Sequence, residues 1–283
     1  MKSQKSKSVI FFGGKFISEE EAMLPVFSDG ALYGWGAFES MRFIKGKSVY
    51  LKEHLERLAQ TCRLLNINIG YSAAKLKQAV AQTVKESALD DLYLRISIWR
   101  LEGKKSKLLI RALKYKAPAQ GTYSRGFSCI VSESAQSSGS ILGRVKSANY
   151  LLQQLAYAQA LKKGCDEAIL LNNSGYIAEA SRSNIFMVKN GALFTPALEC
   201  GCLDGITRRC LIGLALKEDI PLNQGNFTLQ NLYDCDEAFL TNSLIGIMPI
   251  DSVEGVRIGR RQEKDSLMRL LMKKYAALLK SGN

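Results

Sequence analysis

The stretch Gly143-Arg144-Val145-Lys146-Ser147-Ala148-Asn149-Tyr150 sets a lysine just before an apolar helical segment. A single lysine, in a chain with 39 lysines and arginines, is ordinarily a solvated surface charge. Three punctuated segments follow in order, however, and each carries polar groups: Glu179-Ala180-Ser181-Arg182-Ser183-Asn184, Leu203-Asp204-Gly205-Ile206-Thr207-Arg208 and Leu240-Thr241-Asn242-Ser243. The ordered set, rather than any one segment, indicates the walls of a ligand pocket.

Length and composition predict a globular protein. A chain of 283 residues with 47% hydrophobic content can bury a sizeable core in one large domain or two modest ones. No stretch approaches the roughly 18 to 20 apolar residues of a membrane span. The lysine-rich start is followed only by the short apolar run 9–12, so neither a signal peptide nor a membrane partner is expected.

Cysteine usage predicts a reducing compartment. The seven cysteines are odd in number and scattered, and only Cys200 and Cys202 lie close together, without the spacing of metal ligands. This pattern is typical of reduced thiols, so we expect a cytoplasmic protein without a metal site.

The formal net charge of +13 raises the possibility of nucleic-acid binding. The excess is dispersed, however, with its densest patches at 2–7, 104–107 and 273–274, and no basic stripe is interleaved with aromatic residues. Acidic small-molecule substrates explain the charge at least as well, so no nucleic-acid partner is predicted.

The single histidine, His54, excludes several mechanisms, because Ser-His-Asp triads, Cys-His pairs and histidine-rich metal sites all need an imidazole. Leu51, Leu55 and Leu58 recur around it at helical spacing, which favours a structural role for His54. An enzyme built on this chain would use a lysine or a carboxylate as its acid-base group.

The pattern of elements predicts an α+β protein of two domains. A small N-terminal domain, 1–115, is expected to hold strands at 8–12, 15–17, 92–99 and 107–115 and helices at 51–65 and 73–86. The segment 116–121 carries a proline and a glycine between strand-like neighbours and is the expected linker. A larger C-terminal domain, 122–283, follows.

In the second domain, Asn172-Asn173-Ser174-Gly175 and Asn190-Gly191 each lie between strand-like runs and predict hairpins. Helices are expected at 149–163, 207–217 and about 262–279, the first ended by Gly164. Further strands are expected at 126–132 and 238–241.

A set of motifs in this order resembles the class IV aminotransferases, the fold-type IV pyridoxal 5'-phosphate (PLP) enzymes that include branched-chain and D-amino-acid aminotransferases and aminodeoxychorismate lyase. The resemblance runs from about residue 10 to residue 255. Its motifs are Asp29-Gly30 with Tyr33-Gly34-Trp35-Gly36-Ala37-Phe38-Glu39, then His54-Leu55-Glu56-Arg57-Leu58, Lys146, Asp166-Glu167-Ala168, Glu179, Asn184-Ile185-Phe186, Gly205-Ile206-Thr207-Arg208 and Asp236-Glu237. It implies a two-domain fold similar to D-amino-acid aminotransferase.

The resemblance assigns the cofactor chemistry to three residues. Lys146 matches the family's Schiff-base lysine, which also moves the proton during the reaction. Glu179 is similar to the carboxylate that keeps the pyridine nitrogen protonated. Tyr150 resembles the phenol that hydrogen-bonds the cofactor's ring oxygen, although a core aromatic would fit its position equally well.

A phosphate dianion requires backbone N–H groups at a helix N-terminus and a fixed cation. Gly205-Ile206-Thr207 precedes the apolar helix at 210–216, with Thr207 as the expected capping residue. By resemblance, Arg57 is the phosphate arginine and Ser243 adds a hydroxyl. Without the other motifs, the glycine-containing segment would be an ordinary helix cap.

Substrate carboxylates, by the same resemblance, are read by the N-terminal domain and by amides that follow Thr241, including that of Leu244. The candidate readers in the N-terminal domain are Tyr33, Arg42, Tyr93 and Arg95. Tyr93-Leu94-Arg95 is similar to branched-chain enzymes, whereas the short spacing from Lys146 to Tyr150 is similar to the D-amino-acid and lyase subgroups. The subfamily is therefore left open.

The leading hypothesis is a homodimeric PLP-dependent aminotransferase acting on an amino acid of the branched-chain or D-amino-acid class and a 2-oxo acid. The alternative is 4-amino-4-deoxychorismate lyase, which releases pyruvate and 4-aminobenzoate and needs no amino acceptor. A third hypothesis is a basic binding protein that has lost the chemistry of its scaffold; the joint presence of Lys146, Glu179 and Arg57 argues against it.

Overall fold

The structure is a computed structural model that describes residues 9–48, 50–259 and 266–281. The chain divides into two units by its internal contacts. Residues 9–116 with Val145–Asn149 form the first unit, and Ala117–Arg144 with Tyr150–Ser281 form the second. The sequence had suggested a linker at 116–121, and Gln120 and Gly121 of that stretch already belong to a short helix.

The first unit is built on a six-stranded sheet in the order β2-β1-β6-β5-β3-β4, in which every neighbouring pair is antiparallel. β5 and β6 form a long hairpin through a turn at Gly103, whose φ is +67°. The strands are β1 (Val9–Phe12), β2 (Lys15–Ile17), β3 (Gly36–Ile44), β4 (Lys47–Ser48), β5 (Leu92–Arg100) and β6 (Ser106–Lys114).

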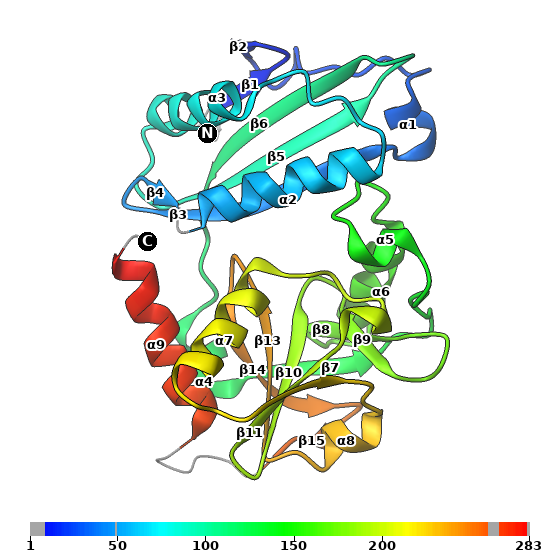
Figure 1. The fold of residues 1–283 in the computed structure, drawn as a ribbon, viewed down its shortest axis with the longest axis vertical. Helices are drawn as coiled ribbons and strands as arrows, with labels where there is room; N and C mark the ends of the chain where they lie inside the picture. Colours follow the sequence, from blue (N-terminus) through cyan, green and yellow to red (C-terminus); the bar gives the residue numbers. More distant parts are fainter. Residues whose placement is uncertain (1–8, 49, 260–265, 282–283) are drawn as a thin grey trace, which may run out of the picture. The chain divides into compact units, whose positions relative to one another are not determined.

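Helices α2 (Leu51–Leu64) and α3 (Ala73–Ser87) lie along the same face of this sheet, as Figure 1 shows. Their apolar faces pack on alternate residues of β3, β5 and β6, because successive side chains of a strand point to opposite faces. The core includes Leu58, Val80 and Met41. The intervening residues of these strands, which include Ser40 and Arg42 of β3, point to the opposite face of the sheet. A short helix that the sequence did not predict, α1 (Asp29–Tyr33), precedes β3.

The segment Val145–Asn149 belongs to the first unit, although the sequence placed it in the second domain. Phe38 donates its backbone N–H to the Lys146 carbonyl at 2.9 Å, and Ala148 donates to the Gly36 carbonyl at 2.8 Å. A Cβ at Gly36 would lie 2.8 Å from the Ile98 carbonyl oxygen and 3.0 Å from the Ala148 Cβ, so a glycine is needed where the segment meets β3.

The second unit is built on a nine-stranded mixed sheet, in which β11 and β12, β14 and β7, and β7 and β8 are parallel pairs. Seven neighbouring pairs give the order β12-β11-β10-β13-β14-β7-β8-β9, with β15 paired to β14. The strands are β7 (Phe127–Val131), β8 (Glu167–Leu171), β9 (Ile177–Ala180), β10 (Asn184–Lys189), β11 (Ala192–Pro196), β12 (Leu222–Gly225), β13 (Glu237–Asn242), β14 (Gly246–Val253) and β15 (Val256–Arg257).

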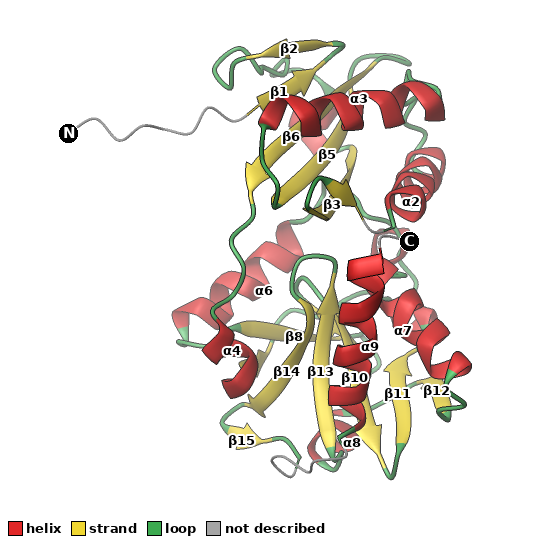
Figure 2. Ribbon diagram, turned by 90° about the vertical axis from the view of Figure 1, so that its left-hand side faces the viewer, coloured by secondary structure: helices red, strands yellow, loops and turns green. Residues whose placement is uncertain are grey.

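Helices cover this sheet on both faces. Ala156 and Ala160 of α6 pack on Ile130 and Leu170, whereas the next residues along these strands face the larger apolar core on the other side. Figure 2 shows α9 running alongside β13. The helices are α4 (Gln120–Arg125), α5 (Ile141–Arg144), α6 (Leu151–Lys162), α7 (Ile206–Lys217), α8 (Leu229–Tyr233) and α9 (Leu267–Ser281), with a 3₁₀ turn at Leu198–Cys200.

Both hairpins predicted in this unit are confirmed. β10 and β11 pair antiparallel through Asn190 and Gly191, whose φ angles of 49° and 73° are those a two-residue hairpin turn requires. β8 and β9 also pair antiparallel. The predicted start of the last helix, Gln262, lies outside the described residues. Within those residues, no helix is long and apolar enough to cross a membrane.

Candidate active site

Lys146 is half-buried in the first unit, and its backbone is held on both sides. Its carbonyl accepts from Phe38, and its N–H donates to the Thr61 hydroxyl of α2 at 3.4 Å. The Lys146 Nζ lies 4.5 Å from the centroid of the Phe38 ring, and the Arg95 guanidinium lies 4.0 Å from the same centroid. Both cations therefore lie within cation–π distance of one aromatic ring.

Arg57 lies behind this segment in a buried cluster of charges. Glu39, which is fully buried on β3, accepts from Arg57 Nε at 2.7 Å and from Arg57 Nη2 at 2.8 Å. His54 Nδ1 lies 2.7 Å from Glu39 Oε2, the oxygen that also accepts from Arg57 Nη2. Burial alone would raise the pKa of Glu39, but the charge of Arg57 and the hydrogen bonds from Arg57 and His54 hold that pKa well below its ordinary value.

This cluster explains two residues that the sequence singled out. His54 is buried and bonded to Glu39, in agreement with the structural role expected for it. Glu39 takes two of the five guanidinium N–H donors of Arg57 and thereby sets the plane of the guanidinium. No role for Glu39 was predicted from the sequence, although its side chain holds both His54 and Arg57.

Three of the four predicted substrate readers of the first unit share the sheet face that carries Phe38. In the β3–β5 register, Ser40 is opposite Arg95 and Arg42 is opposite Tyr93, so these side chains emerge on one face. Tyr93 Oη lies 3.2 Å from Ser40 Oγ, and Arg42 pairs with Asp91 at 3.4 Å. Because Lys146 also reaches Phe38, this face carries the lysine and the readers together.

Tyr33 is placed differently. It ends α1 and is 64% exposed. Tyr33 therefore lies on α1 and not on a strand of the sheet.

In the second unit, Asn184 and Glu179 hold the segment that contains Gly205. Glu179, on β9, is 8% exposed, and its Oε2 accepts from the Leu203 N–H at 3.0 Å. Asn184, which begins β10, donates from Nδ2 to the Leu203 carbonyl at 2.8 Å. A Cβ at Gly205 would lie only 2.0 Å from Asn184 Oδ1, so only glycine fits there.

The N-terminus of α7 is buried without a side-chain cap. Gly205 is the N-cap residue, and Ile206 and Thr207 in the first turn are 4% and 3% exposed. The prediction that Thr207 caps this helix is wrong, because the close approach of Asn184 makes the chain enter the helix at Gly205 instead. A buried helix start whose amides no side chain caps is suited to an anion such as phosphate.

Tyr150 and the loop after β13 are held by a second set of hydrogen bonds. The Tyr150 hydroxyl donates to the Ser181 carbonyl at 2.8 Å. Asn242 Nδ2 donates to the Arg182 carbonyl at 3.1 Å and to Ser183 Oγ at 2.9 Å, and Asn242 Oδ1 accepts from the Leu244 N–H at 2.9 Å. The loop that carries Ser243 and Leu244 is thus fastened to the turn that follows Glu179.

Asn184 and Asn242 are the organising residues that the sequence did not single out. Both stood within quoted motifs, but their roles depend on segments 19 and 60 residues away. Sequence spacing carries no signal for such contacts.

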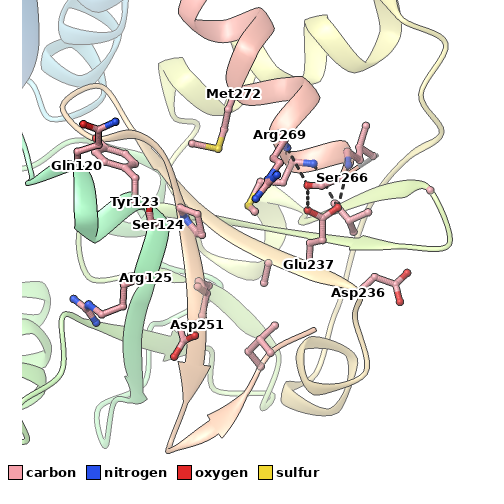
Figure 3. A pocket seen from close by; sticks show the side chains of 18 residues that line it. Gln120, Tyr123, Ser124, Arg125, Asp236, Glu237, Asp251, Ser266, Arg269 and Met272 are labelled. Carbon is pink, nitrogen blue, oxygen red and sulfur yellow. Dashed lines mark hydrogen bonds between the residues drawn. The ribbon is translucent and has the colours of Figure 1, made fainter. Parts of the chain in front are cut away.

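A pocket of about 660 Å³ in the second unit contains none of the predicted site residues. Figure 3 shows Ser266 and Glu237 pointing toward each other there, and Glu237 also accepts from the Leu267 N–H at 3.0 Å. The Glu237 carboxylate caps the start of α9, so its role in this pocket is structural.

Comparisons with known proteins agree with this geometry. The family model for amino-transferase class IV matches residues 36–253. A putative branched-chain-amino-acid aminotransferase of Methanocaldococcus jannaschii is 35% identical over 261 residues, which cover 89% of this chain and 90% of that protein. The aminodeoxychorismate lyase of Bacillus subtilis is 30% identical over 283 residues, covering 94% of each chain.

Solved structures give the same result. The branched-chain aminotransferase of Thermoproteus uzoniensis with norvaline has a TM-score of 0.89 at 29% identity, covering 96% of this chain and 95% of that chain. The Escherichia coli branched-chain amino acid aminotransferase has a TM-score of 0.90 at 26% identity, with the same coverage. The chain belongs to the class IV aminotransferases. It is a PLP enzyme of fold-type IV, as its sequence predicted.

The residues present fit PLP. The buried start of α7, which has no side-chain cap, and the glycine that Asn184 contacts closely suit the phosphate, and the buried carboxylate of Glu179 suits a protonated ring nitrogen.

We expect Gly205→Ala to weaken PLP binding at least tenfold, because its Cβ would collide with Asn184 Oδ1 and displace the first turn of α7. Titration of the protein with PLP, followed by visible absorbance, measures the change. Gly213→Ala, in the same helix with nothing within 4 Å of the new Cβ, is the matched control and should bind PLP as the unchanged protein does. Equal affinity in both variants would contradict this view of the helix start.

Glu39→Gln should lower the free energy of unfolding by about 3 to 5 kcal/mol at pH 7, because it leaves the buried Arg57 without its counter-charge. Since the pKa of Glu39 is lowered on folding, its contribution is complete above the ordinary pKa of about 4.3 and is lost only as the pH falls toward the lower, folded value. Urea unfolding from pH 7 to pH 3 tests both statements.

The control is Glu56→Gln on the exposed side of α2, where the carboxylate lies 3.9 Å from Lys52 and should contribute less than about 0.5 kcal/mol. A difference between Glu39→Gln and the unchanged protein that vanishes already near pH 5 would show that the pKa of Glu39 is not lowered.

Proposed function

We propose that this enzyme transfers the amino group between a branched-chain amino acid and a 2-oxo acid. The observation that carries the proposal is the set of relatives named branched-chain-amino-acid aminotransferases, such as that of Pseudomonas aeruginosa at 30% identity and the probable one of Aquifex aeolicus at 32% identity. The tyrosine and arginine of Tyr93-Leu94-Arg95 support it, because they emerge on the sheet face that carries Phe38.

Lys146 is the residue we assign to the covalent attachment of PLP and to proton transfer. Its amine lies over the Phe38 ring, on a backbone fixed by Phe38 and Thr61. We assign Glu179 to the pyridine nitrogen, where its carboxylate stabilises the protonated ring. Tyr150 is assigned to the ring oxygen.

The phosphate is assigned to Arg57, to the amides of Gly205, Ile206 and Thr207, and to the hydroxyl of Ser243. The start of α7 provides the partial positive charge of the helix dipole. Arg57 provides a full positive charge, and Glu39 sets the plane of its guanidinium. Thr207 then acts from the first turn of the helix rather than from its cap.

Substrate carboxylates are assigned to Tyr33, Arg42, Tyr93, Arg95 and the amide of Leu244. The Leu244 N–H is donated to Asn242 Oδ1, so a carboxylate bound there has to replace or share that hydrogen bond. The remaining four residues belong to the first unit.

Bound PLP supplies an aldehyde that accepts an amino group and a ring that withdraws electrons from the substrate α-carbon. Lys146 Nζ removes the proton from the substrate α-carbon and passes it to the carbon of the cofactor's former aldehyde group, which then carries the amino group. Glu179 keeps a proton on the ring nitrogen throughout. The first substrate leaves as a 2-oxo acid before a second 2-oxo acid enters and takes the amino group, which makes the reaction ping-pong.

We also propose that the enzyme is a homodimer in the cytoplasm. The dimer follows from the family resemblance, and the compartment is supported by seven cysteines that are all free thiols, five of them buried.

The second candidate function is 4-amino-4-deoxychorismate lyase. The relative from Bacillus subtilis that bears this name aligns over 94% of both chains, and the short spacing from Lys146 to Tyr150 is similar to that subgroup. The lyase would use the same lysine and phosphate residues but needs no 2-oxo acid.

Lys146→Ala should abolish the visible absorbance of PLP bonded to the protein. It should also lower turnover by about 10³-fold or more, because no other group would form the bond to the cofactor. Lys146→Arg retains the positive charge but a guanidinium cannot form that bond, so it should behave like Lys146→Ala. An unchanged visible band in either variant would rule out Lys146 as the attachment site.

Substrate choice is tested on the PLP-loaded protein by separate additions of L-leucine, D-alanine and 4-amino-4-deoxychorismate. We expect L-leucine to bleach the visible band and a 2-oxo acid to restore it. Bleaching by D-alanine alone would move the enzyme to the D-amino-acid class. Release of pyruvate from the chorismate without any 2-oxo acid would establish the lyase.

A further inference from the structure

One residue at the start of α7 has no part in the chemistry described so far. Arg208, the third residue of this helix, is buried, with 2% of its surface exposed. Its Nη2 donates to the Pro196 carbonyl at 3.0 Å and to Gln224 Oε1 at 2.8 Å, so the guanidinium reaches from the helix to strands β11 and β12. A cation in such a place costs free energy, because it has given up its hydration.

The position of Arg208 in the helix adds a second cost. The N-terminus of a helix carries a partial positive charge, which favours acidic side chains and disfavours cations in the first turn. The first turn of α7 contains no acidic residue, and Arg209 follows Arg208 directly. An anion bound at the start of α7 would offset both costs.

A single carboxylate pairs with both of these arginines. Asp204 Oδ1 lies 3.7 Å from Arg208 Nη1, and Asp204 Oδ2 lies 3.8 Å from Arg209 Nε. Within the described part of the chain, no other carboxylate forms an ion pair with either guanidinium. Asp204 directly precedes the N-cap residue Gly205, so a net positive charge remains beside the start of the helix.

Arg208 and Arg209 differ in their exposure to water. The side chain of Arg209 is 44% exposed, so solvent screens its charge, whereas the buried charge of Arg208 is screened much less. Burial and the charge of Glu179 raise the pKa of the Cys202 thiol to about 12, and the charge of Arg208 opposes that rise. The charge of Arg208 therefore acts on the segment that leads into the helix.

We propose that the buried charge of Arg208 strengthens the binding of the PLP phosphate at the start of α7. The inference rests on the proposed assignment of that phosphate to the first amides of this helix. Arg208 needs no contact with the phosphate, because its donors are directed to Pro196 and Gln224. It acts through its charge in a region from which water is excluded, where the attraction between opposite charges is strong.

Four variants separate the charge of Arg208 from its other contributions. Arg208→Gln removes the charge but keeps an amide that donates hydrogen bonds, whereas Arg208→Lys keeps the charge and loses the planar guanidinium. Arg209→Gln is the matched control, because it removes an exposed charge that shares the same carboxylate. Asp204→Asn removes the negative charge beside the helix start and should act in the opposite direction from Arg208→Gln.

Each variant is titrated with PLP and with pyridoxal, which has the same ring and aldehyde but no phosphate. The visible absorbance of the bond to Lys146 gives the two dissociation constants. Arg208→Gln should weaken PLP binding by about tenfold or more and pyridoxal binding by less than about twofold, because only PLP carries the charge that Arg208 attracts.

The other variants have equally definite expectations. Arg208→Lys should bind PLP within about threefold of the unchanged protein, because the charge is retained. Arg209→Gln should change PLP binding by less than about twofold, because its charge is screened by water. Asp204→Asn should tighten PLP binding by about twofold or more and leave pyridoxal binding unchanged.

Three results would overturn the proposal. The first is equal weakening of PLP and pyridoxal binding in Arg208→Gln, which would indicate a purely structural role for Arg208. The second is a loss of PLP affinity in Arg208→Lys as large as that in Arg208→Gln, because the charge would then not be the cause. The third is unchanged PLP binding in Asp204→Asn, and this variant decides alone if Arg208→Gln does not fold.

Failure of the underlying assignments would look different. If the unchanged protein shows no visible band with PLP, the proposed function fails. If the unchanged protein binds pyridoxal as tightly as PLP, the proposed phosphate site fails, and the role of Arg208 fails with it.

Discussion

The backbone pairing of Val145–Asn149 with the first residues of β3 is the constraint on which the site depends. It places Lys146 beside Phe38 and, one residue after the paired segment ends, delivers Tyr150 to the second unit as the N-cap of α6. One short stretch thus carries the amine in one unit and the phenol in the other. Gly36 makes this pairing possible, because a side chain there would collide with the Ile98 carbonyl and Ala148.

In each unit, buried polar groups hold candidate residues in place. In the first unit, Glu39 fixes Arg57 and keeps its own charge. In the second, Asn184 closes around Gly205, the N-cap residue of α7, which provides no side-chain cap. Groups of this kind cost stability when they lack a partner, so the rigid arrangement of their neighbours is part of the design of the site.

The sequence predicted the fold class and the main elements because their signals are local. The turn at Asn190-Gly191 and the helical spacing around Leu58 each depend on residues within one element, and both were confirmed. The short helices α1 and α4 carry too few residues for a periodic pattern, and the start of α7 was misjudged because a distant side chain, Asn184, decides it.

In the candidate site, too, residues within local motifs were predicted and residues that act through distant contacts were not. The motif order led to Lys146, Arg57 and Glu179, whose surroundings in the structure suit their expected roles. The roles of Glu39 and Asn242 could not be predicted, because each acts through contacts between segments that lie far apart in the sequence. The spacing of such residues in the sequence does not reveal contacts that exist only in the folded protein.

Borohydride reduction of the PLP-loaded protein, followed by mass mapping of its peptides, tests the central claim most directly, since reduction makes the bond between cofactor and lysine permanent. We expect the added mass of reduced PLP on the peptide that contains Lys146, at a stoichiometry of one per chain. The same mass on another lysine, with Lys146 unmodified, would contradict it.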